Sequence, residues 1–476
     1  MNTKLLKQKI LDLAIRGKLT QQLKSDGTAA DLLKEIADAK SALSQPKGKK
    51  SKDLGQIIPL DKSEAPFEIP NNWEWVRLGD LMSKVGAGST PSGGRNIYEP
   101  SGVKFIRSQN VYNEGLRLDD VVYINESIHK QKQNSKVVGN DLLLNITGAS
   151  IGRCAIVPDD FDEANINQHV LILRLINFKL LKYVHLAITS QFVFRQIMGA
   201  QVGGTKEGLS AERAKELQIP LPPLAEQQRI VEKIQEAFTE IDSIENNKEL
   251  LKTHIKQARQ KILDLAIHGK LVPQNKADEP ASVLLERITR DNPHYEKIED
   301  EPFVIPENWA WCRLGDIADY GKSDNVDVKC IPETAWVLEL EDIEKDSGKI
   351  LQCFSKSERQ INGVRHRFKK GDVLYSKLRT YLNKVLVATK DGFCTTEIMP
   401  IKTAFISNHY LCLVLRSKYF LDYTSMCGYG VKMPRLSTND AKNGLIPLPP
   451  LNEQSRIVAM IDELFSTLDQ MERNLV

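Results

Sequence analysis

The stretch that decides the fold is Gln8–Leu19, with the sequence QKILDLAIRGKL. It recurs as Gln260–Leu271, QKILDLAIHGKL, with eleven of twelve positions identical at an offset of 252. A weaker match continues at the same offset into residues 31–36 and 283–288. A repeat of this strength predicts that the chain contains two equivalent structural units.

Two further repeats lie downstream of this pair. Phe67–Asp80, FEIPNNWEWVRLGD, recurs as Phe303–Asp316, FVIPENWAWCRLGD, with ten of fourteen positions identical. Ile219–Val231, IPLPPLAEQQRIV, recurs as Ile446–Val458, IPLPPLNEQSRIV, with eleven of thirteen identical. The helical stretch after IPLPPL is complete in mid-chain, whereas its second copy is split between the C-terminus and the N-terminus. The two units are therefore circularly permuted, which predicts that the termini come together in space.

The mid-chain stretch has the hydrophobic spacing of a coiled coil. Its seam alternates spacings of four and three, with one polar interruption, Lys248. The seam residues are Ile230, Ile234, Ala237, Ile241, Ile244, Lys248, Leu251, Ile255, Ala258, Ile262 and Leu265. Both parts of the split copy keep this phase, so we expect a long antiparallel two-helix coiled coil with a pseudo-twofold axis. The IPLPPL segments predict the helix starts, and Gly17 and Gly269 predict the far ends.

Two dissimilar segments, 81–216 and 317–443, separate the repeats. Strands are predicted at 103–107, 141–146, 170–174, 372–375 and 410–415, and a helix at 184–198. These patterns indicate the α+β class, with two similar domains separated by the helix pair. The boundaries that we expect are 1–66 for the N-terminal half of the split helix and its linker, 67–222 for the first domain, 223–302 for the central helix and its linker, 303–449 for the second domain and 450–476 for the C-terminal half of the split helix.

The composition is that of an ordinary globular protein. At ~150 residues per domain, a chain of 476 residues predicts two to four domains. A formal net charge of +3 means that any basic surface must come from the arrangement of charges. Seven cysteines without a CxxC pair argue against a disulfide framework and a cysteine-based zinc site. The polar N-terminus and the lack of a long apolar run indicate a cytoplasmic protein with no membrane contact.

The sequence contains no catalytic constellation that stands out. It has no GxxxxGK[ST] phosphate loop, no GxSxG nucleophile elbow and no carboxylates with convincing two-metal spacing. We therefore expect a non-catalytic chain with no catalytic residue, no metal site and no cofactor of its own.

Polar loops in the two dissimilar segments have the residue types that are typical of DNA-binding surfaces. Arg and Gln can bond to base edges, Lys and Ser typically contact phosphates, and glycines allow close backbone approach. The predicted DNA-binding residues are Arg107, Gln109, Asn110, Thr205 and Lys206 in the first segment, and Lys377, Arg379, Tyr381, Lys432 and Arg435 in the second. For any one of them, an ordinary solvated side chain is the simpler alternative.

The three repeated strings and their permuted order resemble the specificity (S) subunit of Type I restriction–modification systems, over essentially the whole chain. The resemblance implies two target recognition domains, each for one half of a bipartite sequence in double-stranded DNA. It implies helices that set the spacing and dock two methyltransferase (M) subunits, with restriction/translocase (R) subunits joining for cleavage. S-adenosylmethionine would belong to the M subunits, and ATP and Mg²⁺ to the R subunits. Base-contacting residues cannot be carried over, because these segments differ between family members.

Three other functions remain open from the sequence. One is the specificity chain of a related system with a fused methyltransferase–nuclease. Another is a coiled-coil scaffold whose domains bind proteins, which predicts no salt-dependent affinity for DNA. The third is an enzyme, which would need a motif that the sequence does not show.

Two sets of repeated residues suggest structural roles. Trp73 and Trp75, and their copies Trp309 and Trp311, are expected to be buried anchors, because both domains share them. Glu226, Gln227 and Arg229 recur as Glu453, Gln454 and Arg456. They are expected either to brace the helix starts or to help form the surface for the M subunits.

Overall fold

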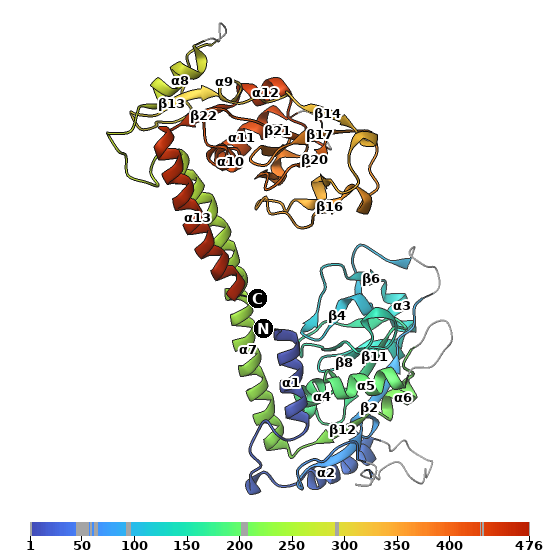
Figure 1. The fold of residues 1–476 in the computed structure, drawn as a ribbon. Helices are drawn as coiled ribbons and strands as arrows, with labels where there is room; N and C mark the ends of the chain where they lie inside the picture. The colour runs from blue at the N-terminus through green and yellow to red at the C-terminus, as the bar shows by residue number, and fades with distance from the viewer. Residues whose placement is uncertain are drawn as a thin grey trace. The chain divides into compact units, whose positions relative to one another are not determined.

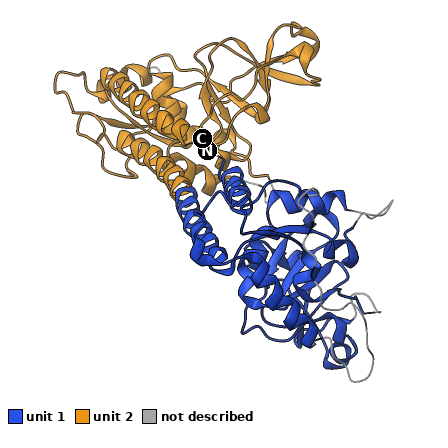
Figure 2. Cartoon of the chain, turned by 90° about the horizontal axis from the view of Figure 1, so that it is seen from below, with its two compact units in different colours: residues 1–246 blue, residues 247–476 orange. Residues whose placement is uncertain are grey.

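The chain divides into two compact units, residues 1–246 and 247–476 (Figure 2). The computed structural model describes residues 2–43, 57, 60, 65–91, 97–200, 208–290, 295–428, 430 and 433–475. Helix α7 (Leu224–Ile267), 44 residues long, passes through both units, as the sequence predicts. Each unit consists of one sheet domain and one part of the helix pair (Figure 1).

In unit 1, helix α1 (Thr3–Ile15) runs antiparallel to the first part of α7. Lys7 pairs with Asp242, and the hydroxyl of Thr3 donates to Glu245 at 3.2 Å. The core of this pair is apolar and joins that of the sheet domain. Its buried residues include Leu11, Ala14 and Ile15 on α1 and Ile230 and Ile234 on α7.

In unit 2, helix α13 (Leu451–Asn474) runs antiparallel to the second part of α7. Arg259 pairs with Asp469 and lies 3.5 Å from a carboxylate oxygen of Glu472. Ile457 and Ile461 are buried in one core with Leu263 of α7. The expected antiparallel helix pairing is therefore present in both units, whereas the expected meeting of the termini involves both units and stays a prediction.

The apolar seam of α7 is buried toward its two ends and exposed in its middle. Ile230 and Ile255 are 0% and 4% exposed, whereas Ile244 and Leu251 are 51% and 41% exposed. The spacing predicts a continuous seam, but α1 begins opposite Glu245 and α13 ends near Arg259. Among the described residues, the seam of α7 is therefore least covered between Ile244 and Leu251.

The glycines that follow the repeated QKILDLAI strings end both helices as predicted. Gly17 and Gly269 have φ angles of 67° and 65°, the left-handed conformation that favours glycine. A Cβ on Gly17 would lie 2.3 Å from Cγ of Pro70, and one on Gly269 would lie 2.2 Å from Cγ of Pro306. The close approach of the chain at each domain start therefore also requires glycine.

The sheet domain of unit 1 has two four-stranded sheets with the orders β6-β3-β10-β7 and β2-β11-β8-β9. The strands of this unit are β1 (Glu74–Arg77), β2 (Met82–Ala87), β3 (Val103–Ile106), β4 (Val111–Tyr112), β5 (Gly115–Leu116), β6 (Val122–Ile124), β7 (Lys136–Val137), β8 (Leu142–Asn145), β9 (Cys154–Ile156), β10 (Ala164–Ile166), β11 (Val170–Leu175) and β12 (Gln218–Leu221). Its other helices are α2 (Ala29–Leu43), α3 (Glu126–Gln131), α4 (Leu181–Ile188), α5 (Gln191–Gly199) and α6 (Ala211–Lys215).

The sheet domain of unit 2 has a five-stranded sheet, β14-β17-β20-β15-β16, and a three-stranded sheet, β19-β18-β21. Its strands are β13 (Ala310–Arg313), β14 (Asp324–Asp327), β15 (Trp336–Leu338), β16 (Phe354–Ser355), β17 (Val364–Phe368), β18 (Val373–Ser376), β19 (Val385–Val387), β20 (Gly392–Thr395), β21 (Ile398–Ile401) and β22 (Leu445–Leu448). Its other helices are α8 (Ala281–Thr289), α9 (Leu314–Ile317), α10 (Asn408–Arg416), α11 (Lys418–Cys427) and α12 (Thr438–Asn443).

The two domains share one plan. Strands β3 and β10 of unit 1 are parallel neighbours, as are β15 and β20 of unit 2. Strand β8 lies between β9 and β11, and β18 lies between β19 and β21. In each unit, the strand that starts the domain pairs with the strand of the IPL segment, β1 with β12 and β13 with β22.

One strand prediction is wrong. Residues 410–415 lie in helix α10, whose N-terminus is capped by the hydroxyl of Ser407, which accepts from the amide of Tyr410. All six residues are buried, so the helix has no polar face within this stretch and its 3.6-residue period is hidden. The predicted helix at 184–198 is present as α4 and α5, with Ser190 capping α5.

The repeated residues at the helix starts brace the fold. Glu226 is 0% exposed and accepts hydrogen bonds from Trp73 Nε1 and Gln22 Nε2, both at 2.8 Å. Glu453 is also 0% exposed and accepts from Gln274 Nε2 at 2.6 Å. The four repeated tryptophans, Trp73, Trp75, Trp309 and Trp311, are 1–5% exposed, which confirms that they are buried anchors.

A salt bridge repeats this brace in both units. Arg229 bonds Asp26 at 2.7 Å, and Arg456 bonds Asp278 at 2.6 Å. The hydrogen bond from Arg229 lowers the pKa of Asp26. Of the two roles expected for the repeated residues at the helix starts, these contacts support bracing.

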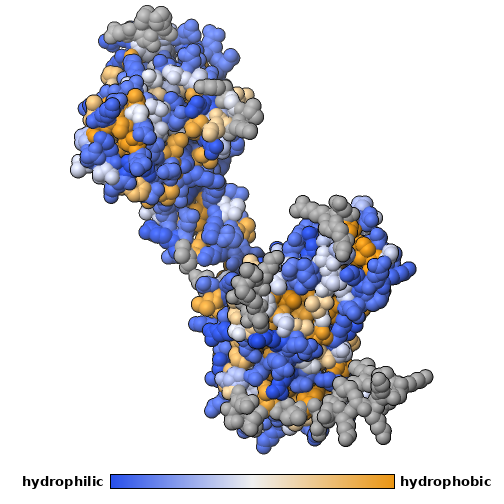
Figure 3. All heavy atoms as spheres, turned by 90° about the vertical axis from the view of Figure 1, so that its right-hand side faces the viewer, coloured by the Kyte–Doolittle hydropathy of each residue, from blue (hydrophilic) through white to orange (hydrophobic). Residues whose placement is uncertain are grey.

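The surface in Figure 3 is mostly hydrophilic, with smaller hydrophobic patches between. In the described parts of the chain, we find no helix with the length and hydropathy needed to cross a membrane.

Burial raises the pKa of Glu453 above its ordinary value of 4.5. The folded chain then holds a proton that the unfolded chain has released, so this group lowers the free energy of unfolding as pH rises above about 4.5. The Tm of Glu453→Gln relative to that of the wild type should therefore be higher at pH 8 than at pH 5, measured by calorimetry. Glu463→Gln, on an exposed position of α13, is the control. The same difference at both pH values would contradict the prediction.

Candidate nucleic-acid interface

Two loops in each domain follow inner strands of its two larger sheets. Loop A follows β3 in unit 1 and β15 in unit 2, at residues 107–110 and 339–342. Loop B follows β8 and β18, at residues 146–153 and 377–384. Each of the four loops contains one turn of 3₁₀ helix.

Loop A has the same internal hydrogen bond in both domains. Oδ1 of Asn110 accepts from the amide of Arg107 at 3.0 Å, and Oδ2 of Asp342 accepts from the amide of Glu339 at 2.8 Å. Asn110 and Asp342 are both 0% exposed. The buried fourth residue therefore fixes the backbone of loop A in each domain, whereas the three residues before it differ between the domains.

Loop B has the same backbone in both domains. The amide of Asn145 donates to the carbonyl of Arg153 at 2.8 Å, and that of Ser376 donates to the carbonyl of Lys384 at 3.1 Å. The φ angles are positive at corresponding positions: 71° and 83° at Gly148 and Gly152, and 53° and 51° at Arg379 and Asn383. Arg379 and Asn383 thus adopt the left-handed conformation without being glycine, which costs about 1–2 kcal/mol per residue.

A third segment joins loop B in each domain. Thr147 forms an isolated β-bridge with Gly208, and Leu378 forms one with Arg435. These partners lie shortly before α6 and α12, respectively. The equivalence therefore extends to a third loop, which packs beside loop B.

Loops A and B are in contact in each domain. The side-chain amide of Asn145, the last residue of β8 before loop B, donates to the carbonyl of Ser108 at 2.8 Å. In unit 2, the ammonium of Lys384 donates to the carbonyl of Leu340 at 2.6 Å. Loop A, loop B and the third segment therefore form one connected surface, which we call the loop surface of each domain.

The predicted residues of the first domain differ in how free they are. Arg107 donates to the carbonyl of Asp120 at 2.9 Å, with its side chain 24% exposed. Gln109 is exposed and bonds the carboxylate of Asp120. Asn110 is buried, and its amide donates to that carboxylate at 2.8 Å. Its contacts hold loop A, whereas Arg107 and Gln109 reach its surface. Thr205 and Lys206 lie outside the described residues.

The predicted residues of the second domain gather around loop B. Lys377 and Arg379 are half-buried, and Tyr381 is 54% exposed. The guanidinium of Arg435, 47% exposed, pairs with Glu397 at 2.7 Å. Because Arg435 and Leu378 form a β-bridge, three of the four described candidates in this domain lie on one loop and the fourth beside it. Lys432 lies outside the described residues.

The two predicted sets are not equivalent in position. Residues 107–110 correspond to 339–342, and residues 377–381 correspond to 146–150, which sequence reasoning did not select. A signal was present in the strings Gly139-Asn-Asp and Gly371-Asp, which precede β8 and β18. Asp141 and Asp372 each accept a backbone bond at 2.9 Å, from the residue three positions earlier. Because these two aspartates occupy equivalent positions, they could have been used to align the sequences of loop B in the two domains.

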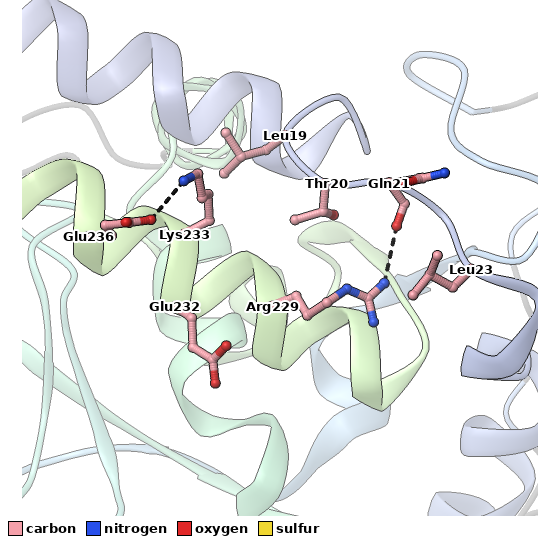
Figure 4. Close-up of a pocket in the computed structure, with 8 residues that line it drawn as sticks. All are labelled: Leu19, Thr20, Gln21, Leu23, Arg229, Glu232, Lys233 and Glu236. Carbon is pink, nitrogen blue, oxygen red and sulfur yellow. Dashed lines mark hydrogen bonds and ion pairs between the residues drawn. The ribbon is translucent and has the colours of Figure 1, made fainter.

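A groove lies beside the start of α7 in unit 1 (Figure 4). Its volume is about 660 Å³, and its lining residues are Leu19, Thr20, Gln21, Leu23, Arg229, Glu232, Lys233 and Glu236. Arg229 donates to the carbonyl of Gln21 at 3.1 Å, so the turn after α1 forms one wall of the groove. Across the described ranges, no cluster of three or more His, Cys, Asp or Glu side chains is placed to hold a metal ion.

The family model of the Type I restriction modification DNA specificity domain matches this chain twice, at residues 70–253 and 306–475. The chain belongs to this family. It is a DNA specificity subunit of a Type I restriction–modification system, with two target recognition domains, and it is itself non-catalytic. The resemblance seen in the repeated strings is thereby confirmed.

Two of three curated relatives match nearly the whole chain, and the third matches about half of it. The EcoAI specificity subunit of Escherichia coli is 26% identical, covering 98% of this chain and 90% of that protein. The Escherichia coli EcoEI specificity subunit is 25% identical, covering 99% and 90%. The match to the EcoDI specificity subunit, 28% identical, spans 55% of this chain and 57% of that protein. A solved structure from a study of complex assembly in the type I R-M system shares the fold, with TM-score 0.55, 17% identity and coverage of 86% of this chain and 94% of that one.

The two glycines of loop B in the first recognition domain are a matched pair for testing its packing. A Cβ on Gly152 would lie 2.7 Å from Cδ2 of Phe194, whereas one on Gly148 would meet no atom within 4 Å. Both alanine substitutions cost about 1–2 kcal/mol of backbone strain, and overpacking adds about 1–3 kcal/mol at Gly152 alone. Gly152→Ala should therefore lower the free energy of unfolding more than Gly148→Ala in urea titrations. Equal losses would show that loop B does not pack on α5 in this way.

Proposed function

We propose that each target recognition domain reads one half of a bipartite sequence in double-stranded DNA through its loop surface. The observation that carries this proposal is the shared backbone of loop B, which displays unlike side chains in the two domains. Ile146, Gly148 and Ser150 in the first domain stand where Lys377, Arg379 and Tyr381 stand in the second. A fixed backbone with variable side chains is what two different half-sites require of one domain plan.

The proposed DNA contacts include six described residues. They are Arg107 and Gln109 in the first domain, and Lys377, Arg379, Tyr381 and Arg435 in the second. Thr205, Lys206 and Lys432 remain proposals from the sequence. Asn110 is proposed to act through loop A, because its own polar groups bond within the chain. Lysine and arginine contacts to phosphate would make binding weaken with salt.

The helices are proposed to set the spacing between the halves and to dock two M subunits, with R subunits joining for cleavage. The M subunits would bring S-adenosylmethionine, and the R subunits ATP and Mg²⁺. The repeated brace supports this arrangement, since Arg229 with Asp26 and Arg456 with Asp278 form the same structure in both units. Two equivalent helix starts can bind two copies of one partner, and the groove of Figure 4 adjoins one of them.

Exchange of residues 317–443 for the same segment of another family member tests the division of labour. The complex should then methylate a motif in which one half has changed and the other half is the same. Genome-wide mapping of methylated adenine in cells measures this, and deletion of the gene, which should remove the motif entirely, is the control. A change in both halves would contradict the assignment of one domain to each half.

Insertion of one heptad after Asn247 tests the spacing role of α7. This point lies between the described contacts of α1 and those of α13. Seven residues lengthen a helix by about 10 Å and nearly keep its phase, so the motif should keep both halves with a spacer about three base pairs longer. The same insertion after Gln235, within the stretch paired with α1, should abolish methylation by disrupting the helix pair. Methylation at the original spacing with the first insertion would refute the spacer role.

A further inference from the structure

Among the described residues, three positions that carry cationic side chains on the loop surface of the second recognition domain are uncharged in the first. Arg435 of the second domain is matched by Gly208, its counterpart in the β-bridge with loop B. Lys377 and Arg379 are matched by Ile146 and Gly148. If loop B reads DNA in both domains, the first domain must do so with other chemistry.

A row of polar side chains lies beside loop B of the first domain. Oγ1 of Thr147 lies 2.7 Å from Nδ1 of His169. Nε2 of the same ring lies 3.1 Å from Nε2 of Gln168. Oγ1 of Thr90 donates to Oε1 of Gln168. These four residues, which we call the polar row, come from three separate segments and form one chain of hydrogen bonds.

The polar row occupies a position that the second domain uses for an ion pair. The amide of Ile146 donates to the carbonyl of His169 at 3.0 Å, and the amide of Lys377 donates to the carbonyl of Glu397, also at 3.0 Å. His169 and Glu397 are therefore equivalent in the backbone. Glu397 pairs with Arg435, whereas His169 contacts a hydroxyl and an amide.

The backbone under the polar row is tightly held. A Cβ on Gly88 would lie 2.0 Å from the carbonyl oxygen of Ile166, so the segment before Thr90 presses against the strand end before Gln168. The side chain of Asn167, 8% exposed, accepts from the amide of His169 at 3.1 Å. Thr90 and Gln168 are nevertheless exposed, and Thr147 and His169 are partly exposed. The row is thus preorganised at the surface, as a specific reader of a ligand must be.

We propose that the polar row is the sequence-reading element of the first recognition domain. It reads base edges through hydroxyl, imidazole and amide groups, whereas the second domain reads them through Arg379 of its loop B. A glutamine amide fits the N6 and N7 edge of adenine, and an arginine guanidinium fits the O6 and N7 edge of guanine. The inference rests on the proposed function and names the residues that perform it in one domain.

The test uses the full chain assembled with its M subunits and a duplex carrying the motif found by methylation mapping. Gln168→Ala and Thr147→Val should each weaken binding about tenfold or more on the intact duplex. The segment exchange assigns one half of the motif to the first domain. On a duplex in which that half is scrambled, both variants should bind with the same affinity as the wild type. Gln131→Ala, an exposed glutamine on α3, is the matched control and should change neither affinity.

A second readout separates the two chemistries. A glutamine contact involves no counterion, so the fold loss for Gln168→Ala should stay constant as KCl is raised. Lys377→Ala should reduce the slope of log affinity against log salt, because it removes a charge near phosphate. A loss for Gln168→Ala that disappears with added salt would overturn the proposed uncharged contact.

The outcomes distinguish this inference from the function on which it rests. Suppose that the wild type prefers the intact duplex and that both polar-row variants bind this duplex as tightly as the wild type does. The polar row is then not the reader, although the bipartite function stands. If the wild type does not distinguish the intact duplex from the scrambled one, the proposed function fails, and this inference fails with it. Thermal unfolding of each variant shows whether a loss of binding reflects a loss of folding.

Discussion

A buried carboxylate at the start of α7 is the contact on which the rest of unit 1 depends. Glu226 accepts hydrogen bonds from Thr20, Gln22 and Trp73, which belong to the turn after α1 and to the start of the sheet domain. A buried carboxyl group is costly without such partners, so the helix pair and the sheet domain cannot separate without breaking these hydrogen bonds. Glu453 occupies the same place in unit 2, where Gln274 is its donor.

This brace lets the loops vary without loss of the framework. The left-handed positions of loop B persist whether glycine, arginine or asparagine occupies them, since their geometry comes from the strands and from the bridge to the third segment. Strain at Arg379 and Asn383 is tolerated because surrounding contacts fix the backbone. The side chains on this backbone are then free to differ between the domains, while the braces remain the same.

The sequence predicted the elements that repeats or hydrophobic periodicity encode. It did not predict the features that depend only on which strands and loops pair in the folded domain. The helix pair, its ends and the two domains followed from the repeated strings. The helix at residues 410–415 was missed because this stretch is apolar throughout. Loops A and B both consist of polar residues after a strand, so the residues selected from the sequence fall on loop A in the first domain and on loop B in the second. Gln168 and His169 lie in the short turn between β10 and β11, and no local pattern joins them to Thr147.

The position of a recognition domain between the two helices of each pair also shapes how the chain folds. Lys7 and Asp242 are 235 residues apart in sequence, and Arg259 and Asp469 are 210 apart. Closing contacts of such separation is slow, because chain entropy must be lost before the contacts form. At about 5–20 residues per second of synthesis, α1 waits roughly 10–50 s for its partner segment. During that time α1 lacks its helical partner on the nascent chain, because the whole first recognition domain is synthesised between the two helices.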